Sequence, residues 1–379
     1  MNILGLYGYF GGNNPEAGWI HDAGASLFIG GEHICSIAEE RLSREKHDGE
    51  YPYKSIKYVL KESNLTEKDI DIVCYPRSIS THGERTEAFL NKEFINAKIS
   101  IVEHHLAHAY AAFYTSPFEV ASVYTQDGGG NYSYINPDAR NTGTYGIGYK
   151  DKGIELIYDF MNPVPNTTIF NIGQIYNYVS VYILKHTGLY SEKELDHPAF
   201  SEASAGKIMG LSAYGNAENI DSPDLFWIEY DGFNLPKIKS LLAAELLSQL
   251  TTNMRASNVN DLAAWLQKQF EDILVKYFSE LKLKEDYLCM GGGCALNVLS
   301  NRRLIQEGVF KDIHVFPGTN DSGLAFGGAI YEAVKREKFI KLPENLGLLG
   351  KTYSFKEIEA TINENFKELE VTTDENFKV

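Results

Sequence analysis

The sequence predicts an α/β protein built from two halves, each with a mixed sheet flanked by helices. Short apolar runs of strand length alternate with segments of helical periodicity along most of the 379 residues. Hairpin–strand–helix units come first and strand–loop–helix units follow, and each set is able to form one layered half. The length suits two or three domains. Two halves that face each other would leave a cleft between them.

The first half, residues 1–142, opens with an apolar strand over residues 2–10 that leads into a glycine-rich turn. Residues 25–29 and 33–38 flank Gly30-Gly31 and predict a hairpin. An amphipathic helix follows at 53–62. Further strands are expected at 70–75, 99–102 and 121–126, with a helix between the last two.

The second half, residues 143–338, repeats strand and helix signals and ends in a different kind of segment. Leu266, Phe270 and Ile273 give the helical spacing expected of a core-facing helix at 262–281. The expected strands are 143–149, 155–159, 287–290 and 313–316; the expected helices are 170–187, 238–250, 295–306 and 324–337; and 206–215 reads as a glycine-punctuated loop. Residues 339–379 are charged and weakly periodic, and we expect a tail or the lead-in to a further domain.

Composition excludes several classes of function. The formal net charge is −16 and no Lys/Arg run stands out, which argues against a nucleic-acid partner. The four scattered cysteines are typical of buried thiols in a reducing cell. No apolar run approaches the length of a membrane span, and the N-terminus opens directly into a strand rather than a signal peptide. We expect a cytoplasmic protein.

Residues 102–130 carry the strongest chemical signal. His104 and His108 are four apart in a helical segment, so both rings lie on one face. Asp127 ends an apolar strand, and Asp321 lies between a strand and a helix. Such a donor set suits Fe(II), Mn(II), Co(II), Ni(II) or Zn(II). The alternatives are two core-edge histidines, and an Asp321 that only caps its helix.

Glycine turns and a basic segment indicate anion binding. Gly291-Gly292-Gly293 stands between a strand and a helix, where backbone N–H groups are able to cradle phosphate, although a tight structural turn is the alternative. Lys207 is a further candidate for phosphate contact.

The His21-Asp22 pair at the first hairpin offers a general base that works near neutral pH. Downstream of the third strand, a charged segment is able to bind anions, or is simply a solvated face; it contains Arg41, Arg44, Lys46 and His47.

Seven motifs in order resemble the O-carbamoyltransferases of antibiotic and nodulation-factor biosynthesis, from Met1 to about Val334. They are His21-Asp-Ala-Gly-Ala25, Ala38-Glu-Glu-Arg-Leu-Ser-Arg-Glu-Lys-His47, His104-His-Leu-Ala-His-Ala109, Asp127-Gly-Gly-Gly130, Lys207-Ile-Met-Gly-Leu-Ser-Ala-Tyr-Gly215, Gly291-Gly-Gly-Cys-Ala-Leu-Asn297 and Gly318-Thr-Asn-Asp-Ser-Gly-Leu-Ala-Phe-Gly-Gly-Ala329. The resemblance implies an actin-like (ASKHA) fold of duplicated ribonuclease-H-like halves, related to the enzyme that transfers threonylcarbamoyl to tRNA adenosine.

The resemblance also implies roles for individual residues. The metal ligands would be His104, His108, Asp127 and Asp321, with Fe(II) the usual ion. His21 would be the base for the acceptor hydroxyl, with Asp22 beside it. Carbamoyl-adenylate or ATP would bind at Lys207, Gly210, Gly291, Gly292, Gly293, Asn297 and Asn320.

Members of this family first make carbamoyl-adenylate in a C-terminal domain and then transfer the carbamoyl group to an alcohol. The Gly-Pro-Arg-Ala-Leu-Gly-Asn-Arg-Ser signature of that domain is absent from these residues. The activating domain is then a separate chain, has been truncated away or has been lost. We expect a metal-dependent transfer subunit that acts on a small-molecule hydroxyl, with a separate protein supplying carbamoyl-adenylate. Alternatives are an ATP-dependent kinase or ATPase of the same fold, or a non-catalytic nucleotide-binding subunit. The acceptor and the oligomeric state stay open.

Overall fold

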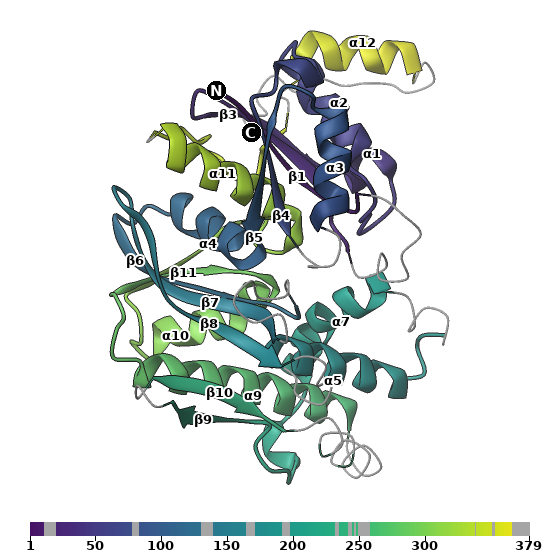
Figure 1. Cartoon of the computed structure of the whole chain (residues 1–379). Coiled ribbons are helices and arrows are strands. Elements are labelled where there is room, and N and C mark those ends of the chain that lie inside the picture. The colour runs from purple at the N-terminus through teal and green to yellow at the C-terminus, as the bar shows by residue number, and fades with distance from the viewer. Residues whose placement is uncertain are drawn as a thin grey trace.

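The computed structural model describes residues 1–10, 20–77, 83–129, 139–163, 171–191, 198–231, 235–241, 245, 248, 258–337, 339–350 and 353–365. Figure 1 shows two stacked α/β layers, with the N-terminus in the upper one. The strands of the two main sheets are β1 (Asn2–Tyr7), β2 (Gly24–Ile29), β3 (Glu32–Ala38), β4 (Ile72–Arg77), β5 (Lys98–Glu103), β6 (Val120–Gln126), β7 (Ala139–Tyr149), β8 (Gly153–Pro163), β11 (Tyr287–Gly291) and β12 (Asp312–Val315).

The two main sheets have the same topology. The first has the order β3-β2-β1-β4-β5 and the second β12-β11-β6-β7-β8. In each, the strand that comes first in sequence is central, two strands pair antiparallel on one side, and two pair parallel on the other. This repeated order confirms the predicted duplication, and the chain has an α/β fold with two five-stranded mixed sheets flanked by helices. β6, within residues 1–142, belongs to the second sheet.

The larger helices are α2 (Tyr53–Glu62), α3 (Gly83–Glu93), α4 (His104–Tyr114), α5 (Ile172–His186), α7 (Pro198–Leu211), α9 (Val259–Glu280), α10 (Val298–Gln306), α11 (Leu324–Glu337) and α12 (Phe355–Asn365), with a single turn at α1 (Glu40–Ser43). Most of the larger helices cover the sheets or pack on helices that do, whereas α12 is largely exposed. The expected apolar stripe of α9 is buried in the second core, where α9 packs against α5, α7 and α10.

The two halves exchange helices at their junction. α4 follows β5 of the first sheet but packs against β6, β7 and β11 of the second. α11 follows β12 of the second sheet but packs against β1, β2 and β4 of the first. The two helices also pack on each other, where Gly327 approaches so closely that a Cβ would lie 2.1 Å from the Ala107 carbonyl oxygen. The start of α4 is thereby placed between the two sheets.

One predicted element is wrong and a second is wrong in its first part. Residues 206–215 are not a loop, because α7 runs to Leu211 and a 3-10 turn, Ser212–Tyr214, follows. Fully buried Ile208 packs in the second core and offsets the helical cost of two glycines. The predicted helix at 238–250 begins instead as strand β10 (Pro236–Ser240), which pairs with β9 (Phe226–Tyr230) and sets Ile238 opposite Ile228. Glu245 and Ser248 are helical, as predicted, and the rest of 242–250 lies outside the described residues.

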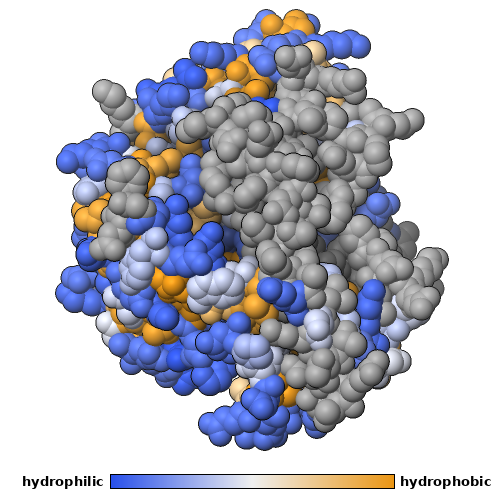
Figure 2. Space-filling model, turned by 60° about the horizontal axis from the view of Figure 1, so that its bottom comes forward, coloured by the Kyte–Doolittle hydropathy of each residue, from blue (hydrophilic) through white to orange (hydrophobic). Residues whose placement is uncertain are grey.

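Residues 339–350 lie along the edge of the first sheet. Lys341 forms a bridge with Glu32, and the Ser36 N–H donates to the Leu349 carbonyl. Figure 2 shows a face on which hydrophilic residues surround separate apolar patches in the part that the structure describes. None of the described helices is both long enough and apolar enough to cross a membrane.

Candidate metal centre

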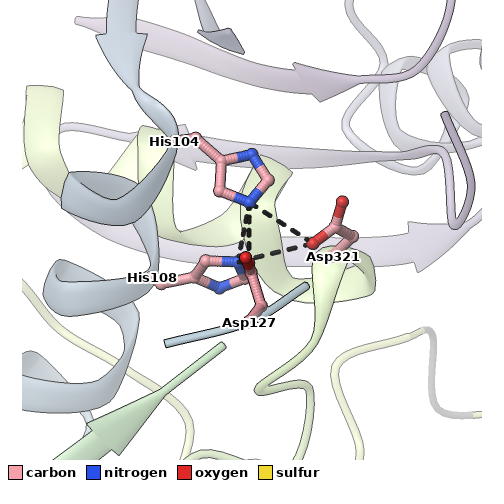
Figure 3. Close-up of side chains that lie close together, drawn as sticks. All are labelled: His104, His108, Asp127 and Asp321. Carbon is pink, nitrogen blue, oxygen red and sulfur yellow. Dashed lines mark hydrogen bonds and ion pairs between the residues drawn. The ribbon is translucent and has the colours of Figure 1, made fainter. Parts of the chain in front are cut away.

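Two histidines and two aspartates converge at the junction of the halves, and Figure 3 shows all four side chains pointing toward one another. His104 is the first residue of α4, directly after β5, and His108 lies one turn further on. Asp127 follows β6, and Asp321 opens the 3-10 turn after β12. The structure therefore brings together all four predicted ligands from the carboxyl ends of three strands.

The donor atoms of these side chains are closely and evenly spaced. The Nε2 atom of His104 lies 3.2 Å from that of His108 and 3.1 Å from Asp127 Oδ2. It lies 3.5 Å from Asp321 Oδ1, and His108 Nε2 lies 3.4 Å from both Asp127 Oδ2 and Asp321 Oδ1. All four residues are at most 9% exposed.

This donor set fits a divalent metal. Donors bound about 2.1 Å from one ion lie about 3.0–3.4 Å apart in octahedral or tetrahedral coordination. The observed spacings of 3.1–3.5 Å lie in or just above that range. Carboxylate oxygens only accept hydrogen bonds, so the few imidazole protons leave several of these contacts without a proton. A bound ion would satisfy all of these donor atoms at once. If Asp321 only capped its helix, its carboxylate would not need to lie against the two histidines.

The charges in the cluster depend on one another. Burial alone would lower the pKa of His108, but the hydrogen bonds and charges of Asp127 and Asp321 raise it to about 9. Burial disfavours both carboxylates, yet the surrounding histidines hold the pKa of Asp127 well below its usual range and lower that of Asp321. Without a metal, the cluster therefore keeps a proton on His108 near pH 7, and a bound cation would replace that proton.

Two residues that the sequence reasoning did not single out hold the ligands in place. The Tyr7 hydroxyl donates to Asp321 Oδ2 at 2.7 Å. His105 Nε2 lies 3.1 Å from the Gly129 carbonyl oxygen, and the Gly129 N–H donates to Asp127 Oδ1 at 2.8 Å. Burial lowers the pKa of His105 to about 3, so the ring is neutral and its Nε2–H donates. His105 could have been found in the sequence because it is the third histidine within five residues. Tyr7 could have been found because it is a tyrosine at the end of a predicted strand.

His21 and Asp22 form a second polar cluster next to the first. Asp22 accepts hydrogen bonds from His21 Nδ1 at 3.0 Å, His47 Nδ1 at 2.9 Å and Asn320 Nδ2 at 2.9 Å. Burial disfavours the ionised carboxylate, but the two histidines hold the pKa of Asp22 well below its usual range. Asn320 immediately precedes Asp321, so the two clusters share one turn of the chain.

Close packing explains why glycine is needed at 291 and 292, independently of any bound phosphate. A Cβ on Gly291 would lie 2.9 Å from the His108 carbonyl oxygen, and one on Gly292 would lie 2.5 Å from that of Gln126. Gly292 adopts a φ of 81°, and its N–H donates to the Thr319 carbonyl. A Cβ on Gly293 would only touch Asp127, so this glycine lies beside the metal centre.

The remaining predicted nucleotide contacts lie on different elements. Asn297 caps α10 through the Ser300 N–H and exchanges two hydrogen bonds with Gln267, so its amide serves the fold. Lys207 and Gly210 are exposed on α7, with Lys207 Nζ 4.6 Å from the centre of the Tyr190 ring.

Comparisons with known proteins identify the family to which the chain belongs. The family model for the carbamoyltransferase N-terminus matches residues 16–87 and 74–330. The nodulation protein NolNO of Sinorhizobium fredii is 28% identical over 82% of this chain and 46% of its own length. An uncharacterized protein of Synechocystis, sll1178, is 25% identical over 94% of this chain and 62% of its own.

Among solved structures, full-length HypF in its phosphate- and nucleotide-bound form aligns with a TM-score of 0.47 at 13% identity, over 88% of this chain and 56% of that one. The chain spans about half the length of the curated relatives it matches. The family match covers most of the residues from which both sheets and the His–Asp cluster are built, and the chain belongs to the carbamoyltransferase N-terminal domain family.

Proposed function

We propose that this chain carries out metal-dependent transfer of a carbamoyl group from carbamoyl-adenylate to a hydroxyl group of a small molecule, such as a sugar or another natural product. The observation that carries the proposal is the cluster of His104, His108, Asp127 and Asp321, whose donor atoms lie at the spacing of a metal's ligands in a carbamoyltransferase-family chain. Two imidazole nitrogens and two carboxylates suit Fe(II), and also Mn, Co, Ni or Zn.

A metal bound there would supply a positive charge that stabilises negative charge on the donor's oxygens during transfer. The chain's own residues fix the ligands: Tyr7 orients Asp321, and Gly129 orients Asp127. The adenylate would bind beside the cluster, near Gly293. Asn320 joins this region to Asp22 on the first half.

His21 would be the general base. Ionised Asp22 accepts the Nδ1–H of His21, which leaves Nε2 as the ring nitrogen that takes a proton. The acceptor's oxygen forms a bond to the carbamoyl carbon, and its proton moves to His21. The bond from that carbon to the phosphate-linked oxygen breaks, and its electron pair leaves with AMP.

The test is transfer from the activated donor. Purified protein, loaded with Fe(II), is incubated with synthetic carbamoyl-adenylate and a panel of hydroxyl acceptors, and products are detected by mass spectrometry. We expect a carbamoylated acceptor with the wild type and none with His104→Ala combined with Asp127→Ala. Equal product from both proteins would refute the proposal.

We further propose that a separate protein supplies the carbamoyl-adenylate. ATP and carbamoyl phosphate given to this chain alone should then yield no product, whereas the synthetic adenylate should. Product from ATP and carbamoyl phosphate alone would show that these residues activate the group themselves. Hydrolysis of ATP without any transfer would instead favour the kinase or ATPase alternative.

A further inference from the structure

The Asp22 carboxylate joins three side chains from three parts of the chain. Its Oδ1 accepts from His47 Nδ1 at 2.9 Å, and its Oδ2 accepts from His21 Nδ1 at 3.0 Å and Asn320 Nδ2 at 2.9 Å. Asp22 is only 5% exposed, so these donors replace water around its charge. A carboxylate held at both oxygens has little freedom to rotate.

The backbone around this carboxylate is strained and held in place. Asp22, Arg44 and His47 have φ values of 62°, 67° and 58°, in the left-handed region that non-glycine residues seldom adopt. Backbone bonds connect the two segments, from Ala23 N–H to the Asp48 carbonyl and from Tyr9 N–H to that of Gly49. The His47 N–H donates to Glu40 Oε2 at 3.0 Å. Strain that the surroundings maintain is typical of functional sites.

The contacts also fix the form of each histidine. A carboxylate can only accept, so both rings present Nδ1–H to Asp22 and carry no proton on Nε2 in their neutral state. His21 and His47 meet edge to face with ring centres 6.4 Å apart. His47 donates to Asp22 Oδ1, whereas the candidate base His21 donates to Oδ2 of the same carboxylate.

We propose that His47 is a positioning residue for carbamoyl transfer, which acts through Asp22: by holding Oδ1, it turns Oδ2 toward His21 and Asn320. This inference rests on the proposed function, because it assigns His47 to the machinery of that reaction. The same carboxylate keeps the base at a fixed place relative to the turn that bears Asp321. The acceptor's base and the metal centre are thereby aligned across the two halves.

Three substitutions of His47 distinguish the role of its Nδ1 atom from that of its Nε2 atom. Asparagine places an N–H donor where Nδ1 lies and tolerates the left-handed backbone, whereas glutamine places its amide nearer Nε2. His47→Ala should lower kcat about 10- to 100-fold with KM nearly unchanged, since a misoriented base costs rate rather than binding. His47→Asn should recover most of that loss and His47→Gln should not. His186→Ala, on an exposed face of α5, is the matched control and should behave as the wild type.

Nitrogen-15 NMR of the histidine rings gives a reading that needs no turnover. His21 and His47 should both show the Nδ1–H tautomer in the wild type, and His21 should keep it in His47→Asn but become a mixture in His47→Ala. The inference is overturned if His47→Ala transfers at the wild-type rate, if His47→Asn is as impaired as His47→Ala, or if His47 carries its proton on Nε2. If the wild type transfers nothing, the proposed function fails, and the tautomers still decide whether Asp22 orders both rings.

Discussion

Single hydrogen bonds around the candidate metal centre matter because they decide where its four side chains point. Tyr7 donates to the Asp321 oxygen that faces away from the histidines. Partners of this kind typically contribute 10- to 100-fold to metal affinity, so we expect Tyr7→Phe to weaken binding by about 10-fold or more. Competition with a chelator of known affinity measures it. Tyr214→Phe, at a tyrosine that is 79% exposed, is the control, and equal affinities for both variants would contradict the prediction.

Protonation of His108 predicts how metal binding depends on pH. Its pKa is raised to about 9 in the metal-free protein, so a metal must displace a proton at any lower pH. Affinity should therefore increase about 10-fold per pH unit between pH 7 and 9 and level off above. Titrations with metal at pH 7, 8, 9 and 10 would show this, and a constant affinity would refute it.

The raised pKa of His108 should also make the stability of the metal-free fold depend on pH. Stability should decrease with rising pH, whereas metal affinity should increase. Because the folded-state pKa of His108 lies above the ordinary value of 6.5, its charged form stabilises the fold. That contribution is fully present below pH 6.5 and is lost as pH rises through 9. In chelator, the urea midpoint of the wild type should fall over this interval, and that of His108→Gln should fall less.

At the scale of elements, two helical glycines should respond in opposite ways to alanine. Gly206 on α7 is exposed with open space around it, so Gly206→Ala should stabilise by up to about 1 kcal/mol through helix propensity. A Cβ on Gly327 would meet the α4 backbone at 2.1 Å, so Gly327→Ala should destabilise by about 1–3 kcal/mol or more. Urea unfolding compares them. Loss of stability in both would mean that Gly206 also lies in a packed contact.

Elements with a clear period were predictable, and those governed by distant contacts were not. The stripe of α9 and the hairpin of β2 and β3 follow from spacing and from Gly30-Gly31. The α7 helix could not be predicted from local spacing, because its glycines suggest a loop. The burial of Ile208 against distant elements favours the helix instead.

At the scale of the whole molecule, the duplication was predictable, whereas the exchange of α4 and α11 was not. Sequence order places each helix after a strand, but it does not say which sheet the helix will cover. The candidate ligands were predictable because strand ends and helical spacing are local signals. The Tyr7–Asp321 bond joins residues 314 apart, and the His47–Asp22 bond joins two separate segments; no local pattern encodes either contact.

Because the ligands come from segments of both halves, metal should stabilise the molecule as one unit. His104 follows β5 of the first sheet, and Asp127 and Asp321 follow β6 and β12 of the second. At a free-metal concentration 100 times Kd, binding adds about 2.7 kcal/mol and raises Tm. Asp321→Ala should lose most of this gain, and Asp221→Ala, an exposed aspartate, should keep it. Thermal unfolding with metal and with chelator measures both, and a gain in Tm that survives Asp321→Ala would place the ion elsewhere.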